Sequence, residues 1–342
     1  MKAAMYYGLN DVRVEEIPKP KIDSNEILVE MKACGVCGSD LMEWYLEKRV
    51  PLVLGHEPAG VIAETGGKVE GFRVGDRVFA HHHVACLTCH YCRRGDFTMC
   101  QKFSKTHLEP GGFAEYFRVP ADNLQVDCLE IPDNVSFEEA TLIEPIACGV
   151  RAIKECAIQQ ADSVVIIGAG PTGMINSALA RLSGATQVIV SDVIPYRLRA
   201  AKKFGTDLTV NVQNENLVDR VVGATEGRGA DVVVVTAPNI EAYASALEVC
   251  RKGGTICVFA PTSPEQSIPL SPQRLFFRGI KIVSSYSTSH LETRTALELI
   301  SSGRIDAKAL ITHRFPLSHA AEAFRTAAEN KECLKVVILN EN

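Results

Sequence analysis

The sequence predicts an α/β protein of two domains, one rich in β-structure and one built on a doubly wound parallel sheet. Three observations predict this class. The chain has 342 residues, more than a single hydrophobic core usually supports. Residues 1–148 carry short alternating apolar runs separated by Gly and Pro, a pattern typical of half-buried strands. Residues 149–288 instead alternate continuous apolar runs with helical patterns, as parallel sheets do.

The β-rich domain is predicted to be a partly open barrel or a coiled antiparallel sheet. Runs such as 26–31 and 76–79 alternate between apolar and polar residues, and the loops between such strands are where functional residues gather. The C-terminal tail adds a helix over 320–328 and a strand over 336–339, which we expect to return to this domain. We therefore assign residues 1–148 and 289–342 to one domain and 149–288 to the other.

The second domain begins with a strand over 163–167, a helix over 174–182, a strand over 187–190 and a helix over 196–204. Further apolar runs follow at 231–235 and 255–259. Because parallel strands need long crossover connections, usually helical, this alternation predicts a doubly wound sheet. The pattern fades around 284–289.

A glycine-rich turn joins the first strand of this domain to its first helix, at residues 168–173 (Gly-Ala-Gly-Pro-Thr-Gly). Glycines permit the tight turn and let backbone N–H groups approach a pyrophosphate at the positive end of the helix. Asp192 follows at the end of the next strand, where a carboxylate binds ribose hydroxyls and repels a 2′-phosphate. We therefore expect NAD, although Arg197 could pair with a 2′-phosphate, which leaves NADP open. The candidate cofactor-binding residues are Gly168, Gly170, Thr172, Gly173, Asp192 and Arg197.

Charge and hydropathy argue against several classes of protein. The net charge of −5 and the isoelectric point of about 6.0 give no basic surface for nucleic acid. No apolar stretch approaches the ~20 residues of a membrane span, and the first residues lack the apolar core of a secretory signal. We expect a cytosolic protein that binds neither nucleic acid nor membranes.

A crowded group of cysteines predicts a metal site. Disulfides seldom persist in the cytosol, so such a group indicates metal binding before cross-links. Four thiolates close a tetrahedral zinc site with no open position, which would order the loop. Four unrelated thiols and an iron–sulfur cluster are the alternatives. The cysteines are Cys86, Cys89, Cys92 and Cys100. The flanking histidines, interpreted as loop or surface residues rather than ligands, are His81, His82, His83 and His90.

Two short segments supply donors for a second, catalytic zinc: residues 34–40 (Cys-Gly-Val-Cys-Gly-Ser-Asp) and 55–60 (Gly-His-Glu-Pro-Ala-Gly). A zinc that polarises an alcohol needs few protein ligands and one exchangeable position. Cys37, His56 and a carboxylate would provide this set. A lone Cys or His is more often a core or surface residue, so the prediction depends on the two motifs together with the four-cysteine loop.

In this order, the two motifs, the four-cysteine loop and the glycine turn resemble the zinc-containing medium-chain dehydrogenases, which include alcohol, sorbitol and threonine dehydrogenases. The resemblance extends along essentially the whole chain, as far as residues 311–315 (Ile-Thr-His-Arg-Phe) before the final helix. It implies a GroES-like catalytic domain made from both termini and a central Rossmann domain that binds NAD. It also implies two zinc ions per chain and a homo-oligomer, a tetramer or a dimer.

The resemblance further implies ligands for the catalytic zinc. Cys37 and His56 would bind the ion, and Glu57 would be a direct or an alternating ligand. Glu144 stands where many alcohol dehydrogenases have a cysteine, as in sorbitol-type members. It would contact the metal directly or through the bound water, and its alternative role is that of a carboxylate at a helix start.

A proton relay and a substrate pocket follow from the same resemblance. Ser39 matches the hydroxyl that begins the family's relay, whereas Met42 stands where many relatives have the outer histidine, so direct release to water could replace that step. The Arg-Tyr pair of sorbitol-type enzymes falls at Ser285 and Tyr286, so the arginine is absent. Aromatic residues that could line a pocket are Tyr286, Trp44 and Phe113, although aromatic residues lie in the core more often than not.

The expected reaction is reversible hydride transfer from a secondary alcohol or small polyol to NAD, with L-threonine oxidation as the second possibility. Three other classes fit less well. A zinc-ribbon nucleic-acid binder conflicts with the acidic charge and the nucleotide motif. A metal-free quinone reductase would lack Cys37, Glu144 and the cysteine group, and a zinc hydrolase would not need the nucleotide motif.

Overall fold

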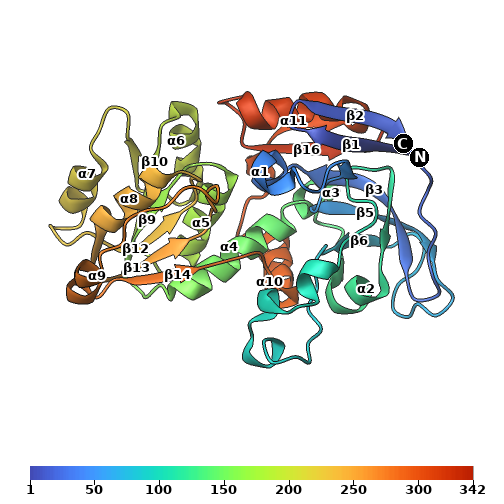
Figure 1. Ribbon diagram of the computed structural model, residues 1–342, viewed down its shortest axis with the longest axis horizontal. Helices are drawn as coiled ribbons and strands as arrows, with labels where there is room; N and C mark the ends of the chain where they lie inside the picture. Colours follow the sequence, from blue (N-terminus) through green and yellow to red (C-terminus); the bar gives the residue numbers. More distant parts are fainter. Residues whose placement is uncertain (342) are drawn as a thin grey trace. The chain divides into compact units, whose positions relative to one another are not determined.

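The computed structural model describes residues 1–341 and contains two compact units. Unit 1 consists of Met1–Ala147 together with the chain from Thr288 onwards, and unit 2 consists of Cys148–Ser287. Both are drawn in Figure 1. Within the described residues, no helix has the length and apolar character needed to cross a bilayer.

Unit 1 is built on a seven-stranded sheet in the order β15-β16-β3-β5-β6-β8, with β7 also pairing with β3. The pair β15–β16 is parallel and the other pairs are antiparallel. A smaller antiparallel sheet has the order β2-β1-β4. The strands of the large sheet are β3 (Ile27–Gly35), β5 (Pro58–Thr65), β6 (Arg77–Ala80), β7 (Tyr116–Val119), β8 (Cys128–Glu130), β15 (Ile311–Pro316) and β16 (Lys335–Leu339). Those of the small sheet are β1 (Lys2–Gly8), β2 (Asp11–Glu16) and β4 (Leu52–Val53).

The C-terminal tail completes unit 1. The helix and strand predicted there are present as α11 (Ala320–Glu329) and β16, and β16 pairs with β3. Phe324 of α11 is buried between Tyr6 and Phe113, with ring centroids 5.9 Å and 5.5 Å away. Phe113 is itself fully buried in this core, so the prediction that it lines a substrate pocket is wrong.

Two helices carry residues of unit 1 that matter below; α2 lies within unit 1, and α4 begins in it and continues into unit 2. Helix α2 (Ala121–Asp127) buries Asn123 and Asp127 completely. Helix α4 (Ile143–Cys156) has Glu144 in its first turn, where a carboxylate is favoured by the helix dipole. The remaining helices of unit 1 include α1 (Glu43–Leu46), α3 (Phe137–Ala140) and α10 (His290–Ser301).

Unit 2 contains a six-stranded sheet, parallel throughout, in the order β11-β10-β9-β12-β13-β14. Counted along the chain this order is 3-2-1-4-5-6, that of a doubly wound nucleotide-binding fold. The sheet has one strand, β14, after the last predicted apolar run at 255–259, and this strand ends where the sequence pattern fades. Its strands are β9 (Ser163–Ile167), β10 (Gln187–Asp192), β11 (Leu208–Asn211), β12 (Ala230–Val235), β13 (Cys250–Val258) and β14 (Lys281–Ser284).

Helices flank this sheet, as Figure 1 shows. Every residue of β9 is buried, which is why its sequence is a continuous apolar run after Ser163 rather than an alternating one. Val165, Val233 and Ile256 pack on one face with residues of α7 and α8. The helices are α5 (Pro171–Leu182), α6 (Pro195–Ala201), α7 (Leu217–Ala224), α8 (Ile240–Val249) and α9 (Pro272–Arg278).

Asp231 connects three strands of unit 2. Its Oδ2 accepts hydrogen bonds from the backbone N–H of Ser163 at 2.8 Å and from the Ser163 hydroxyl at 2.7 Å, and its Oδ1 pairs with Arg251 of β13. Burial raises the pKa of Asp231, but the hydrogen bonds from Ser163 and the charge of Arg251 outweigh it. The pKa of this carboxyl is therefore held below its ordinary value.

Replacing Asp231 with asparagine should lower the free energy of unfolding by about 2 kcal/mol at neutral pH, because charge-assisted hydrogen bonds are lost. Since the folded-state pKa is depressed, this stabilisation is fully present above the pKa of the unfolded chain. It is lost as pH falls through the folded-state pKa. Urea unfolding at neutral and acidic pH tests the prediction: the difference between Asp231→Asn and wild type should shrink in acid. An equal difference at both pH values would contradict it.

Candidate active site and metal centres

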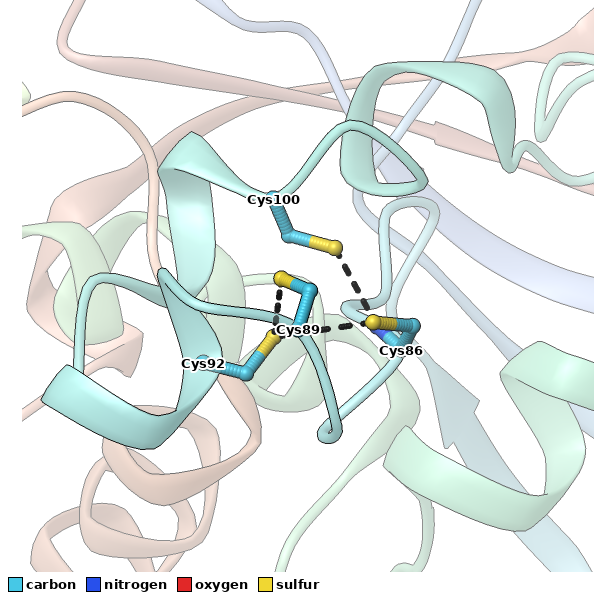
Figure 2. A group of neighbouring side chains, drawn as sticks. All are labelled: Cys86, Cys89, Cys92 and Cys100. Atoms are coloured by element: carbon cyan, nitrogen blue, oxygen red, sulfur yellow. Dashed lines mark hydrogen bonds between the residues drawn. The ribbon is translucent and has the colours of Figure 1, made fainter.

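The four crowded cysteines converge in unit 1, as Figure 2 shows. Their sulfur atoms all lie within 4.8 Å of one another, with Cys89 and Cys92 3.5 Å apart and Cys86 and Cys92 3.9 Å apart. None of the four forms a disulfide. Hydrogen bonds from Thr88 lower the pKa of Cys86 to about 6, so this thiol ionises at neutral pH, the form that binds metal. The arrangement fits a closed tetrahedral zinc site.

Replacing Cys89 with serine tests the structural role of this site. We expect the variant to lose about one equivalent of zinc per chain and to unfold several degrees lower, because zinc binding contributes directly to the folding of such loops. Metal analysis and thermal unfolding measure both effects. Unchanged zinc content would show that the four thiols do not act as one site.

A second donor group consists of Cys37, His56 and Glu57, whose ligand atoms lie within 4.8 Å of one another. Cys37 directly precedes the 3-10 helix η1 (Gly38–Leu41), and the two other residues directly precede β5. The sequence therefore identified three side chains that the fold brings together from two separate loops. One thiolate, one imidazole and one carboxylate form a ligand set suited to zinc, and the buried carboxylate needs a positive partner.

Asp40 supports this group and was not predicted from the sequence. Its side chain is 2% exposed, its Oδ2 accepts the backbone N–H of Cys37 at 3.0 Å, and its Oδ1 lies 3.4 Å from His56 Nδ1. Burial lowers the pKa of His56, but the negative charges of Asp40 and Cys37 raise it well above its ordinary value. The group thus attracts positive charge, as a cation site must. The sequence could have indicated this role, because Asp40 stands in the same motif as Cys37.

Lys335 of β16 is a second residue of this site that was not predicted from the sequence. Its ammonium group pairs with Glu57 Oε2, and both side chains are almost completely buried. Burial raises the pKa of Glu57 against the opposing charge of Lys335, and Glu57 raises the pKa of Lys335 in spite of burial. The two residues come from distant parts of the chain, so no local pattern could have paired them.

Glu144 lies in a third donor group, with His81 and His82, whose ligand atoms again lie within 4.8 Å of one another. The two groups adjoin, because the rings of His56 and His82 have centroids 5.0 Å apart and the charge of Glu144 raises the pKa of Glu57. His81 lies in the loop after β6, as one of the two interpretations had it, but it is fully buried and is therefore not a surface histidine.

The other two flanking histidines differ from His81 and His82. His83 contacts the carbonyl oxygen of Thr106 through Nδ1, and burial lowers its pKa to about 4. His90 is exposed. His83 and His90 therefore fit the interpretation that the flanking histidines are loop or surface residues rather than metal ligands.

The predicted relay and pocket residues are partly exposed. Ser39 lies in η1, and its carbonyl accepts the backbone N–H of Met42 at 3.3 Å. Trp44 in α1 is 36% exposed, and Tyr286, just after β14, is 50% exposed. Ser285 is buried, and its hydroxyl has no hydrogen-bond partner among residues 1–341.

The glycine turn of unit 2 has the geometry expected of a pyrophosphate loop. Gly168 has a φ of +110°, and a Cβ on Gly173 would lie 1.9 Å from the carbonyl oxygen of Gly168, so a side chain at either position would be strained or excluded. Gly170 directly precedes α5, and Thr172 lies in its first turn. Backbone N–H groups at this helix start therefore remain accessible to an anion.

Asp192 stands beside this turn at the end of β10. One carboxylate oxygen accepts the backbone N–H of Ala169 at 2.7 Å and the other accepts that of Ile194 at 2.8 Å. Arg197 lies on α6, and its Nε is buried without a hydrogen-bond partner in the described chain. The acid is thus fixed against the glycine loop, where a ribose would lie.

Comparisons with known proteins identify the family. The family described as "Alcohol dehydrogenase GroES-like domain" matches residues 23–133, and that described as "Zinc-binding dehydrogenase" matches residues 171–302. A sorbitol dehydrogenase from Bacillus subtilis (strain 168) is 34% identical over 99% of this chain and 97% of its own length. This chain belongs to the zinc-containing medium-chain dehydrogenases. An L-threonine 3-dehydrogenase from Alteromonas mediterranea is 32% identical over 92% of each chain.

Solved structures of dehydrogenases agree with this fold. A protein described as a zinc-binding dehydrogenase from Sinorhizobium meliloti 1021, bound to NADP, has a TM-score of 0.89 and 27% identity, covering 99% of this chain and 98% of its own. A short chain alcohol dehydrogenase from E. coli CFT073, complexed with NADH, has a TM-score of 0.88 and 28% identity, covering 99% of each chain.

The predictions of family, fold class and reaction class are therefore confirmed. This medium-chain dehydrogenase combines a GroES-like region with a Rossmann sheet, and it is a zinc-dependent, nicotinamide-linked enzyme acting on alcohols or polyols. The alternative classes, a zinc-ribbon binder, a metal-free reductase and a zinc hydrolase, are not supported.

Proposed function

We propose that this dehydrogenase oxidises a small polyol or secondary alcohol, reversibly, with NAD as the hydride acceptor. The observation that carries the proposal is the group of Cys37, His56 and buried Glu57, with Asp40 holding its first two members. It occurs in a chain that shares 34% of its residues with a sorbitol dehydrogenase. L-Threonine is the second candidate substrate, favoured by the similarity to a threonine dehydrogenase.

The proposed roles follow from the contacts of each side chain. Cys37 and His56 hold the catalytic zinc, Glu57 is its direct or alternating ligand, and Glu144 is a further carboxylate beside them. A zinc ion bound there supplies Lewis acidity that lowers the pKa of an alcohol. Asp40 keeps the imidazole of His56 oriented, and Lys335 balances the charge of Glu57. The Ser39 hydroxyl accepts the proton released by the alcohol and passes it outward, directly to water because Met42 carries no titratable group.

The two regions of the sequence have separate tasks in this proposal. Residues 1–148 and 289–342 form the catalytic domain, with its two zinc ions, and residues 149–288 bind NAD through Gly168, Gly170, Thr172 and Gly173. Support comes from the two donor groups in unit 1 and the glycine turn in unit 2.

Asp192 is proposed to select NAD over NADP. Its carboxylate is fixed beside the glycine loop and can accept hydrogen bonds from ribose hydroxyls, whereas a 2′-phosphate would meet a like charge. Replacing Asp192 with asparagine keeps an acceptor and removes the charge. The ratio of kcat/KM for NAD to that for NADP should fall by about tenfold, or ~1.4 kcal/mol.

Arg197 provides the matched second variant. If its guanidinium pairs with the 2′-phosphate once Asp192 is neutralised, adding Arg197→Ala should reverse the gain in NADP use. Steady-state kinetics with both cofactors measure the ratio. A ratio that is unchanged in Asp192→Asn would contradict the assignment.

A substrate screen tests the proposed reaction. Sorbitol, xylitol, a vicinal diol, simple secondary alcohols and L-threonine are each offered with NAD, and NADH is followed by its absorbance. We expect the highest kcat/KM for a polyol or secondary alcohol, with a preference that differs from sorbitol enzymes because Ser285 replaces their arginine. A higher value for L-threonine would favour the second candidate, and no activity on any of these compounds would overturn the proposal.

We further propose that the enzyme is a cytosolic homo-oligomer, a tetramer. Support comes from unit 2, where β14 is an edge strand and the preceding helix, α9, exposes 79% of Phe276 and 71% of Phe277. Exposed edges and large apolar side chains favour association. Light scattering of the purified protein measures the mass, and a monomer would overturn the proposal.

A further inference from the structure

We propose that His82 determines substrate specificity by hydrogen bonding to a second hydroxyl, on the carbon next to the one that is oxidised. The imidazole lies beside the catalytic donor group of Cys37, His56 and Glu57 and acts as a contact for the substrate, not as a metal ligand. The inference rests on the proposed function and deepens it, because it identifies vicinal diols and polyols as the preferred class of alcohol.

The ring of His82 lies directly beside the residues proposed to hold the catalytic zinc. Its centroid is 5.0 Å from that of the His56 ring, and the two ring planes are inclined at 51°. One of its ring nitrogens also lies within 4.8 Å of a carboxylate oxygen of Glu144. A hydroxyl bound at Cys37 and His56 therefore has this imidazole as a close polar neighbour.

His82 belongs to the accessible side of this region. It is partly exposed, as are Cys37 and His56. By contrast, the neighbouring residues His81 and Glu57 are fully buried. A small molecule that approaches His56 from solvent can therefore also contact His82.

The His82 ring lacks the polar partner that adjoining imidazoles have. Nδ1 of His81 lies 3.3 Å from Asp127 Oδ2, and Nδ1 of His56 lies 3.4 Å from Asp40 Oδ1. Nδ1 of His82 is buried and has no hydrogen-bond partner within residues 1–341. An unsatisfied buried nitrogen costs about 1–3 kcal/mol, and a ligand hydroxyl that inserts beside the ring would relieve this cost.

The position of the ring is set by a fixed backbone. The side-chain amide of Asn123, in α2, donates to the carbonyl oxygens of His81 at 2.8 Å and of His82 at 2.9 Å. Asn123 is itself fully buried. The imidazole is therefore presented from a rigid segment, as recognition of one particular hydroxyl requires.

The chemistry of imidazole fits a hydroxyl ligand. In the neutral ring one nitrogen donates and the other accepts, and a hydroxyl group can do both. The reacting hydroxyl is taken up at Cys37 and His56, so the group that meets His82 is a different one, and in a polyol the nearest is on the adjacent carbon. A site built to bind a hydroxyl disfavours an analogue that lacks it.

A matched pair of substrates tests the inference. Propylene glycol and isopropanol differ only in the hydroxyl next to the secondary alcohol. The ratio of kcat/KM for the glycol to that for isopropanol should fall by about tenfold in His82→Phe, which keeps an aromatic ring and removes both nitrogens. His82→Gln, which keeps a donor and an acceptor, should retain most of the ratio. The control His107→Phe, at an exposed position outside the donor groups, should leave it unchanged. An unchanged ratio in His82→Phe would overturn the inference.

Two further readouts do not depend on turnover. Zinc content should be the same in His82→Phe and wild type, and loss of one equivalent would overturn the inference, because His82 would then act through the metal. Calorimetry with the zinc-loaded enzyme, in the absence of NAD, gives Kd for both compounds, and the ratio should change by the same factor of about ten in His82→Phe. Failure of the proposed function appears separately, as binding without formation of NADH. In that case an unchanged ratio of Kd would still overturn the role of His82.

Discussion

Replacing Cys37 with alanine should reduce kcat/KM for the best alcohol by about 10³-fold or more, a loss of at least ~4 kcal/mol of transition-state stabilisation. Cys37 contributes the one thiolate of the proposed catalytic group, and its backbone N–H is fixed by Asp40. Without this ligand, His56 and Glu57 would hold the ion weakly. The rate of NADH formation and the zinc content measure the effect together, since about one equivalent of zinc should be lost while the four-cysteine site keeps its own.

Cys34 offers a matched control for this variant. It lies three residues earlier in the same motif, is fully buried, and belongs to none of the donor groups. Cys34→Ala should therefore retain zinc content and kcat/KM within a few fold, with some loss of stability from the cavity. Equal loss of activity in both variants would show that Cys37 acts through packing rather than through the metal.

Replacing Lys335 with methionine should lower the free energy of unfolding by about 3–5 kcal/mol, because a buried carboxylate then loses its partner. Glu57 is fully buried, and Lys335 is its ion-pair partner. Denaturant unfolding measures the change. The double variant Lys335→Met with Glu57→Gln should recover much of the loss, since it removes the isolated charge.

A surface ion pair provides the comparison. Lys19 pairs with Glu64 at 2.8 Å, and both side chains are about half exposed. Lys19→Met should change the free energy of unfolding by no more than about 1 kcal/mol. A loss as small as this in Lys335→Met would contradict the view that the pair with Glu57 is a structural requirement of the site.

Local patterns in the sequence were sufficient to predict much of the fold. The strand over 163–167 was predicted with the bounds it has, because all of its residues are buried and the four after Ser163 are apolar. The helix and strand of the C-terminal tail were predicted within a residue or two of α11 and β16. Apolar runs and helical periodicity involve only residues that are close in the chain, so they can be recognised in a single sequence.

The residues that complete the donor groups could not be predicted in the same way. Lys335 meets Glu57 only because β16 pairs with β3, whose neighbour β5 begins just after Glu57. Asp127 meets His81 because α2 packs beside the end of β6. These contacts arise from pairing between distant segments and have no local sequence pattern. Phe113 could have lined a pocket or packed in the core, and it packs in the core; aromatic character alone does not separate the two.

Anomalous scattering at the zinc absorption edge, from crystals of the zinc-loaded enzyme, tests whether this chain holds a catalytic zinc on Cys37 and His56 in addition to the zinc on its four-cysteine loop. We predict anomalous density between Cys37 Sγ and the His56 ring, together with a peak among Cys86, Cys89, Cys92 and Cys100. A peak in the cysteine loop with none at Cys37 would contradict the account.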